Sequence, residues 1–199
     1  MAVYQIVKEG NPVLREKSKP ITRINDAAIR LLDNLRDTLR DTPKGVGLSA
    51  PQIGISKRAF VVELAESEIY LEMVNPELTD MEGSEEGWEG CLSVPGIEGL
   101  VPRAGKLKVL YTDRESRQNE LVAEGYLARI IQHENDHLDG LLFRDKAVTL
   151  NTEPEKDRAD DQPDDGEGKR EADREGDRNG GRENGRKDSR EVSGEGGGQ

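Results

Sequence analysis

Apolar residues are confined to one part of this chain. Residues 1–150 contain 62 apolar residues, whereas residues 151–199 contain three. The first segment has the length and apolar content of one domain with a buried core. The second has too little apolar surface to offset the conformational entropy that is lost when a chain becomes ordered. We therefore predict one folded domain over residues 1–150 and a disordered charged tail over residues 151–199.

The predicted tail carries one regular pattern. Arginine recurs at every fourth position from Arg170 to Arg190, a spacing that would place the side chains on one face of a helix. Four glycines interrupt this stretch, so a solvated low-complexity segment is favoured over a helix. The tail has 16 acidic residues against ten basic ones, which predicts poor nonspecific affinity for RNA.

Charge and cysteine content restrict the compartment and the partners. The whole chain has 41 acidic residues against 29 basic ones, a formal net charge of −12, which argues against a general nucleic-acid binder. Cys91 is its one cysteine, so no internal disulfide can form. The first ten residues lack the apolar core of a signal peptide, and no apolar run is long enough to span a membrane. We expect a cytoplasmic protein that binds neither DNA nor membranes.

Two segments have the periodicity of amphipathic helices. Residues 25–40 place apolar side chains at helical spacing after a residue, Asn25 or Asp26, that can cap the helix. Residues 125–138 repeat the pattern. Between them, the glycine- and proline-rich residues 41–54 predict an irregular loop. Four strand-like runs follow this loop, at residues 59–64, 70–74, 107–112 and 120–123.

The order of these elements predicts the fold class. A helix, several strands and a final helix favour an α+β domain whose largely antiparallel sheet packs on the long C-terminal helix. Gly140 can end that last helix, because glycine readily adopts the left-handed conformation that follows many helices. The N-terminal helix and the disordered tail complete the predicted arrangement.

The predicted C-terminal helix contains the sequence HENDH at residues 133–137, an H-E-x-x-H pattern. Four residues are about one helical turn, so both imidazoles project from the same face and can bind one metal ion. The glutamate lies beside them, where it can act as a base. These are the only two histidines of the chain, and Ile130 places apolar surface next to them on the same face. The pattern predicts a metal site rather than two unrelated surface histidines.

A catalytic metal site of this kind needs a third protein ligand and one position open for water. No histidine is left, and Cys91 is the attractive candidate. It lies in the segment EGCLSVP at residues 89–95, whose glycine and short extended run can bring the backbone close to a site. A lone cysteine is more often a small buried hydrophobe, but beside two histidines without a third partner it is favoured as a ligand.

Three segments, taken in order, resemble the signature motifs of the peptide deformylase family. They are GVGLSAPQ at residues 45–52, EGCLS at 89–93 and QHENDH at 132–137. The resemblance extends to residues 7–14 and the helix after them, and it covers nearly all of residues 1–150. One departure is Ser49, where the family commonly has alanine, a change between two small residues. The tail is unlike the family core.

The resemblance implies a metal-dependent hydrolase that removes the N-formyl group from the N-terminal methionine of newly synthesised proteins and releases formate. Cys91, His133 and His137 would be the ligands of one divalent metal ion. Iron(II) is the usual native ion of the family, and zinc(II) also suits these ligands. Glu134 would act first as the general base and then as the acid.

The same resemblance assigns the oxyanion and substrate contacts. Gln52 and the backbone N–H of Leu92 would bind the developing oxyanion. Gly47 would offer backbone contacts to the peptide, and its neighbour Val46 would also bind substrate. The implied partners are N-formylmethionyl nascent peptides, with transient proximity to the ribosome as a further expectation.

Other functions remain open at this point. The histidine pair also serves zinc endopeptidases, although familiar members use a third histidine or a carboxylate where this chain offers Cys91. A non-catalytic, zinc-stabilised binding module usually fills all four metal positions with cysteine or histidine, and this chain has three such residues. A cysteine hydrolase with Cys91 as the nucleophile would leave one of the two histidines without a role.

Overall fold

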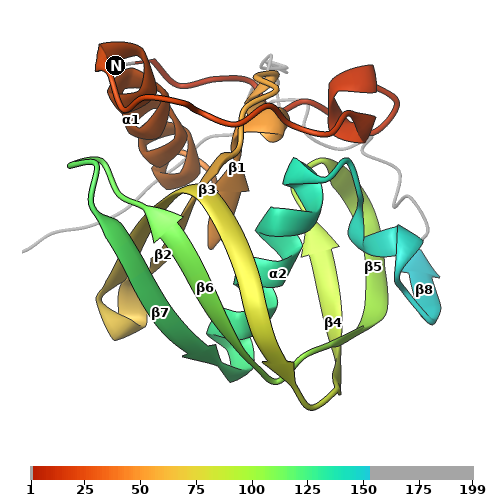
Figure 1. The fold of residues 1–199 in the computed structure, drawn as a ribbon. Helices are drawn as coiled ribbons and strands as arrows, with labels where there is room; N and C mark the ends of the chain where they lie inside the picture. The colour runs from red at the N-terminus through yellow and green to blue at the C-terminus, as the bar shows by residue number, and fades with distance from the viewer. Residues whose placement is uncertain (1, 153–199) are drawn as a thin grey trace, which may run out of the picture. The chain divides into compact units, whose positions relative to one another are not determined.

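The computed structural model describes residues 2–152, which form two α-helices, eight strands and short 3-10 helices (Figure 1). Most of the segment predicted as a tail, with its predicted disorder and its helical alternative, lies outside these residues. The elements are η1 (Pro12–Arg15), α1 (Asp26–Arg40), β1 (Gly47–Ser49), η2 (Ala50–Ile53), β2 (Ala59–Leu64), η3 (Ala65–Ser67), β3 (Ile69–Glu82), β4 (Glu85–Cys91), β5 (Val94–Arg103), β6 (Lys106–Thr112), β7 (Gln118–Glu124), α2 (Gly125–Leu138), η4 (Phe143–Asp145) and β8 (Thr149–Thr152).

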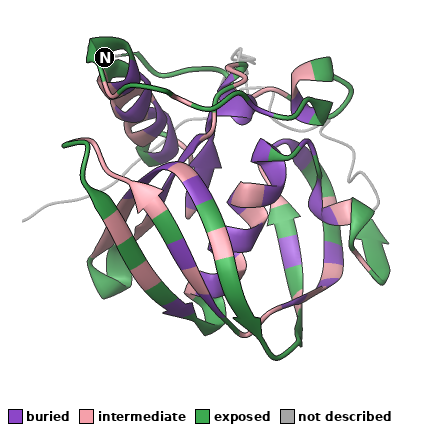
Figure 2. Ribbon diagram, in the orientation of Figure 1, coloured by how far each residue is buried: buried purple, intermediate pink, exposed green. Residues whose placement is uncertain are grey.

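The five-stranded sheet has the order β1-β2-β3-β6-β7, and all its neighbouring strands are antiparallel. Its strand β2 has the predicted bounds and is buried on both faces (Figure 2). Ala59 and Val61 pack in the apolar cluster that contains the leucines of α1. Phe60 and Val62 point the other way and join the cluster that contains the apolar face of α2. The sheet is therefore covered by α1 on one face and by α2 on the other.

Both predicted helices are confirmed. The Asn25 side chain caps α1 by accepting hydrogen bonds from the N–H groups of Ala27 and Ala28. Helix α2 spans the predicted residues, and Gly140 follows its C-cap with a φ of 76°, donating its N–H to the His137 carbonyl. Among residues 2–152, no helix combines the length and the apolar character that crossing a membrane requires.

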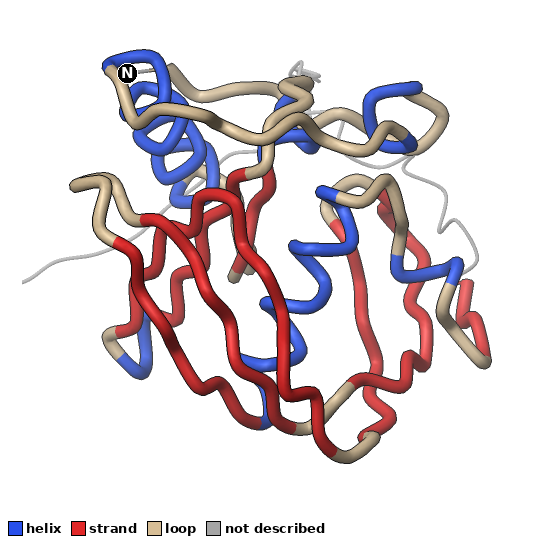
Figure 3. The backbone as a smooth tube through the Cα atoms, viewed as in Figure 1, coloured by secondary structure: helices blue, strands red, loops and turns tan. Residues whose placement is uncertain are grey.

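The antiparallel α+β fold is confirmed, but it contains a second sheet that the sequence patterns did not predict. Strands β4, β5 and β8 form it, in that order, on the other side of α2 (Figures 1 and 3). Strand β4 contains two glycines and β5 contains two glycines and two prolines, so both lack the usual strand signal. The pairing of β8 with β5 includes Asn151 and Thr152, so β8 continues two residues past position 150.

The prediction of an irregular loop at residues 41–54 is wrong in part. This segment contains β1, which pairs with β2, and the short helix η2. A strand of three residues is too short to show a period, and it forms because Gly47, Leu48 and Ser49 pair with buried residues of β2. Strand β3 is also longer than the predicted residues 70–74, and its pairing with β6 contains irregularities. Strand β1 lies at the edge of the sheet.

Candidate metal centre

Helix α2 presents both histidines toward the end of β4. The rings of His133 and His137 lie 5.0 Å apart between centroids, one turn from each other on the helix. The Sγ atom of Cys91 lies 3.3 Å from Nε2 of His137. One donor atom from each of the three residues lies within 4.8 Å of the others. The structure therefore brings together the three side chains that the sequence analysis proposed as ligands.

Cys91 lies at a tight turn between β4 and β5, where it pairs with Val94. The Ser93 N–H donates to the Cys91 sulfur at 3.4 Å. The carbonyl groups of this turn are held by the N-terminal segment, because Lys8 Nζ donates to the Leu92 oxygen at 2.7 Å and the Glu9 N–H donates to the Ser93 oxygen at 2.8 Å. Within residues 2–152, the Leu92 N–H has no hydrogen-bond acceptor. It is available to a ligand.

Glu89, which the sequence analysis did not single out, orients His133. Its carboxylate oxygen lies 3.0 Å from Nδ1 of His133, which leaves the other ring nitrogen free to face Cys91. Arg103 forms a bidentate ion pair with the same carboxylate through two bonds of 2.8 Å. Burial by itself would raise the pKa of Glu89, but the hydrogen bonds from Arg103 and His133 outweigh it and lower the pKa to about 2.

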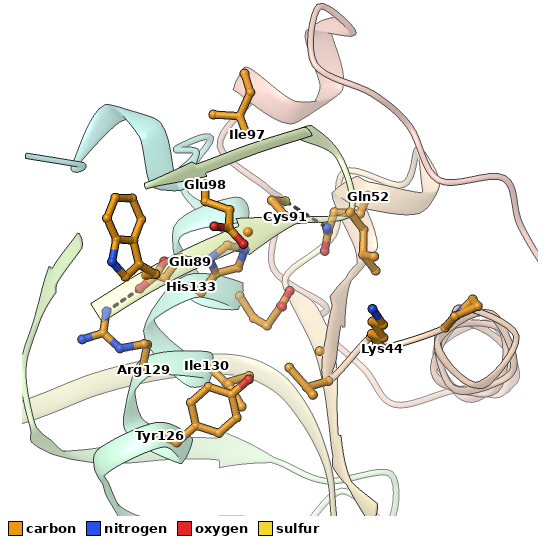
Figure 4. Close-up of a pocket in the computed structure, with 18 of the residues that line it drawn as sticks. Lys44, Gln52, Glu89, Cys91, Ile97, Glu98, Tyr126, Arg129, Ile130 and His133 are labelled. Atoms are coloured by element: carbon orange, nitrogen blue, oxygen red, sulfur yellow. Dashed lines mark hydrogen bonds and ion pairs between the residues drawn. The ribbon is translucent and has the colours of Figure 1, made fainter. Parts of the chain in front are cut away.

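The Arg103 guanidinium connects this carboxylate to α2. Its Nη1 donates to Asp136 at 2.5 Å, and Lys146 contacts the other oxygen of Asp136 at 2.6 Å. Arg129 of α2 adds a bond of 2.8 Å to Glu89 (Figure 4). Since Arg103, Glu89 and Asp136 are all buried, these charges stabilise the fold only as a complete network.

The electrostatics of the three candidate ligands fit a cation. Burial disfavours a charged His133, yet Cys91 and Glu89 overcome this and raise its pKa to about 10. Burial and the neighbouring His133 lower the pKa of His137, and its Nδ1 has no hydrogen-bond partner among the described residues. One sulfur and two imidazole nitrogens are donors that iron and zinc prefer, and magnesium does not. The residues present therefore fit a divalent transition metal.

Glu134 is buried beside this centre. Burial raises the pKa of its carboxyl to about 7, although the neighbouring His133 works against this shift. Its Oε2 has no hydrogen-bond partner within residues 2–152. Gly47 of β1 approaches so closely that a Cβ atom there would lie 2.5 Å from Oε1. A side chain at position 47 would therefore displace the Glu134 carboxylate.

Gln52 reaches the same centre from η2. Its Oε1 accepts hydrogen bonds from the N–H of Ser49 at 2.9 Å and from the Ser49 hydroxyl at 2.8 Å. Its Nε2 points toward the Cys91 sulfur at 3.6 Å (Figure 4). The same Nε2 lies 3.4 Å from the Ser93 hydroxyl. The amide thus presents its donor group to the candidate metal centre.

A cavity of about 510 Å³ opens onto these residues (Figure 4). Gln52, Cys91, His133 and Glu134 lie in its wall. Its apolar lining comes from three segments of the chain. The apolar residues in it include Val46, Trp88, Leu92, Ile97, Tyr126 and Ile130. The cavity is large enough for a few residues of an extended peptide.

Comparison with known proteins agrees with this geometry. The sequence model of the family described as polypeptide deformylase matches residues 3–153. The chain belongs to the polypeptide deformylase family. A peptide deformylase of Pelotomaculum thermopropionicum is 51% identical over 150 residues, which cover 75% of this chain and 95% of that protein. One of Syntrophomonas wolfei is 48% identical over 153 residues, covering 77% and 99%.

Solved peptide deformylases share the fold. The crystal structure of the Thermotoga maritima deformylase superposes with a TM-score of 0.71 at 36% identity, covering 75% of this chain and all of that one. An Acinetobacter baumannii deformylase bound to Met-Ala-Ser superposes with a TM-score of 0.68 at 34% identity, covering 73% and 98%. The chain is therefore a deformylase-family enzyme, of a metal-dependent class of hydrolases, rather than a binding module.

The structure adds residues to the deformylase site that sequence reasoning missed. Glu89 stands two positions before Cys91, so the two side chains share one face of β4, and this spacing was a signal that could have been used. Arg103 follows 14 residues later at the far end of β5, and no local pattern connects it to Glu89. The contact of the Ser49 hydroxyl with Gln52 was also not predicted.

Proposed function

We propose that this chain hydrolyses the N-formyl group of N-formylmethionyl peptides and releases formate. The observation that carries this proposal is the convergence of Cys91, His133 and His137 beside the buried carboxyl of Glu134, where a peptide-sized cavity is lined by Cys91, His133 and Glu134. A cysteine nucleophile is disfavoured, because both histidines face Cys91 together and a simple nucleophile and base pair would use one of them.

Cys91, His133 and His137 would hold one divalent ion, with iron(II) as the proposed native metal and zinc(II) as a competent substitute. When bound, the ion would activate a water molecule and polarise the formyl oxygen. Glu89 would keep His133 in the orientation that ligation needs, since it holds Nδ1 at 3.0 Å. Metal analysis after anaerobic purification should find about one ion per chain in the unaltered protein and little in a Cys91→Ala variant.

Glu134 would move the proton of the reaction. As a carboxylate it takes a proton from the attacking water, whose oxygen forms a bond with the formyl carbon. When the bond between this carbon and the amine nitrogen breaks, the protonated carboxyl returns the proton to that nitrogen. A pKa of about 7 suits both roles near neutral pH, and Oε2, which has no hydrogen-bond partner in the described part of the chain, is available for the transfer.

Gln52 and Leu92 would stabilise the negative charge that develops on the formyl oxygen. The Nε2 group of Gln52 and the N–H of Leu92 are both donors beside Cys91, and the Leu92 N–H has no acceptor among the described residues. Donors of this kind contribute about 3 to 4 kcal/mol each in comparable acyl-transfer sites. One donor is a side-chain amide and the other is a backbone N–H, so neither has to change its protonation state to stabilise the oxyanion.

The edge strand β1 would bind the peptide. Strand β1 pairs with β2 on one side only, and Val46 and Gly47 line the cavity. An extended peptide can add to such an edge through backbone hydrogen bonds. The apolar lining, with Ile130 on the helix, suits a methionine side chain. The Met-Ala-Ser that occupies the Acinetobacter baumannii deformylase has the same N-terminal residue.

The proposed substrate also restricts the partners. N-formylmethionyl chains are nascent proteins, so we place this enzyme in the cytoplasm, with transient proximity to the ribosome during synthesis. The acidic chain, with a net charge of −12, offers no basis for nonspecific binding to DNA.

The decisive experiment supplies two substrates to the purified enzyme. Formyl-Met-Ala-Ser is expected to yield one formate per tripeptide, and an unblocked protein is expected to remain intact. Formate is measured with a coupled dehydrogenase, and internal cleavage is measured by mass spectrometry. Internal cleavage without formate would identify an endopeptidase and refute the proposed function.

A further inference from the structure

Ser49 is fully buried at the junction of β1 and η2, where it contacts the amide of Gln52 twice. Its backbone N–H donates to Oε1 of Gln52 at 2.9 Å, and its hydroxyl donates to the same oxygen at 2.8 Å. Ser49 and Gln52 are 0% and 1% exposed, so water does not compete for these bonds. The Oε1 atom therefore has two donors from one residue.

These contacts determine which end of the amide faces the reaction. A backbone N–H can only donate, so the amide atom opposite the Ser49 N–H must be the oxygen. The NH₂ group then necessarily faces the Cys91 sulfur and the Ser93 hydroxyl, on the side of the candidate metal centre. The hydroxyl adds a second donor to the amide oxygen, which holds the amide more firmly and draws electron density away from its nitrogen.

We propose that Ser49 is a positioning residue for deformylation, whose hydroxyl holds and polarises the Gln52 amide so that Nε2 donates more strongly to the developing oxyanion. The inference rests on the proposed function. Because the oxyanion exists only in the transition state and the intermediate, the hydroxyl accelerates turnover and leaves ground-state binding of the peptide unchanged. An alanine at this position, as is common in the family, would retain only the backbone donor.

The first test compares Ser49→Ala with the unaltered enzyme, using formate release from formyl-Met-Ala-Ser. We expect kcat to fall about three- to tenfold with KM unchanged, as for the loss of one buried hydrogen bond that acts in the transition state. The matched control is Ser18→Ala, which removes another buried serine hydroxyl that has no partner among the described residues. The control should keep kcat, and both variants should keep their metal content and Tm.

The second test asks whether the hydroxyl acts through Gln52. In a Gln52→Ala background, Ser49→Ala should have no further effect on kcat, so the two substitutions should be fully non-additive. An independent loss in that background would show that the hydroxyl acts elsewhere, for example on Glu134, and would overturn the proposal. An unchanged kcat in Ser49→Ala, or a change in KM alone, would overturn it as well. Absence of formate from the unaltered enzyme would instead refute the proposed function.

Discussion

The five-stranded sheet packs apolar side chains against α1 and α2, whereas the three-stranded sheet joins α2 largely through buried charges. The first contact includes Phe60 and Val62 of β2 against Ile131 of α2. The second has a small apolar cluster around Val94 and Phe143, and beside it the ion pairs of Arg103. The two halves of the candidate metal centre are therefore attached to the molecule by different interactions.

This difference has a consequence for the site. Apolar packing is non-directional, so the five-stranded sheet fixes where α2 lies but does not by itself orient polar side chains. A bidentate ion pair is directional, and the pair of Arg103 with Glu89 holds the carboxylate that contacts His133. We infer that the sheet positions the helix and that the charge network sets the orientation of the ligands.

The largest expected effect is the loss of kcat on substitution of Glu134, which lies on α2. Glu134→Gln removes the proposed proton carrier without disturbing either sheet, so kcat should fall by about 10²- to 10⁴-fold. Metal content and Tm should stay near those of the unaltered enzyme. Formate release and metal analysis measure the two properties, and full turnover in this variant would rule out Glu134 as the base.

Removing the central charge of the network should cost stability and metal affinity together. Arg103→Met leaves Glu89 and Asp136 buried without their shared partner, and we expect unfolding to become easier by about 3 to 5 kcal/mol. The comparison is Ile131→Ala, which should lose about 2 to 5 kcal/mol through the cavity that it leaves in the apolar cluster. Urea unfolding measures both free energies. Equal metal affinities in the two variants would contradict the inference that the charge network, and not the apolar packing, orients the metal ligands.

Acid should weaken the ion pairs that join the three-stranded sheet to α2 before it weakens the apolar packing of the five-stranded sheet. The pKa of Glu89 is lowered in the folded protein from 4.5 to about 2, so this carboxylate contributes stability above pH 4.5 and loses it as pH falls toward 2. The midpoint of urea unfolding, followed between pH 6 and 3, should decline less steeply in Glu89→Gln than in the unaltered chain. Parallel profiles would show that Glu89 does not contribute to acid sensitivity.

Glu89→Gln should also weaken metal binding by about 10- to 100-fold, because the group that orients His133 loses its charge. Competition with a chelator of known affinity measures this loss. The matched control is Glu63→Gln, which removes a carboxylate that pairs with Arg40 on the surface of the five-stranded sheet. Metal affinity that is unchanged in Glu89→Gln would show that the ligands do not depend on the network.

The smallest effect is expected from the predicted tail. Removal of residues 153–199 keeps all of β8, and kcat and Tm should remain nearly unchanged. Removal from residue 149 onward also deletes β8 and exposes the edge of β5, so it should lower Tm. A large loss in the shorter deletion would show that the chain was divided at the wrong place.

Elements with a strong period were predicted well, and elements formed by pairing were not. Helix α2 has the predicted bounds because its apolar residues recur at helical spacing, and β2 has them because it contains an unbroken apolar run from Ala59 to Val62. Strand β5 contains two prolines and two glycines, and it forms because β4 and β8 pair with its two sides. Its stability depends on pairing with other strands, and a local sequence pattern cannot predict that pairing.

The candidate site divides in the same way. The H-E-x-x-H spacing predicts two imidazoles on one helix face, because the helix itself sets that geometry. Cys91 followed from the shortage of other donors and from the family resemblance, and the structure places it 3.3 Å from His137. Nothing local connects Arg103 to Glu89 or makes the Ser49 hydroxyl a partner of Gln52, so these contacts had to be observed.

By itself, the sequence determined the faces of the two long helices, the chemical identity of the donors and the family, because these depend on residue type and on spacing along the chain. The tertiary structure alone decided that β4 would bring its sulfur and carboxylate to α2, and that a buried guanidinium would hold them there. The physical reason is that contacts between distant segments depend on the packing of the whole core, to which segments far apart in sequence contribute together.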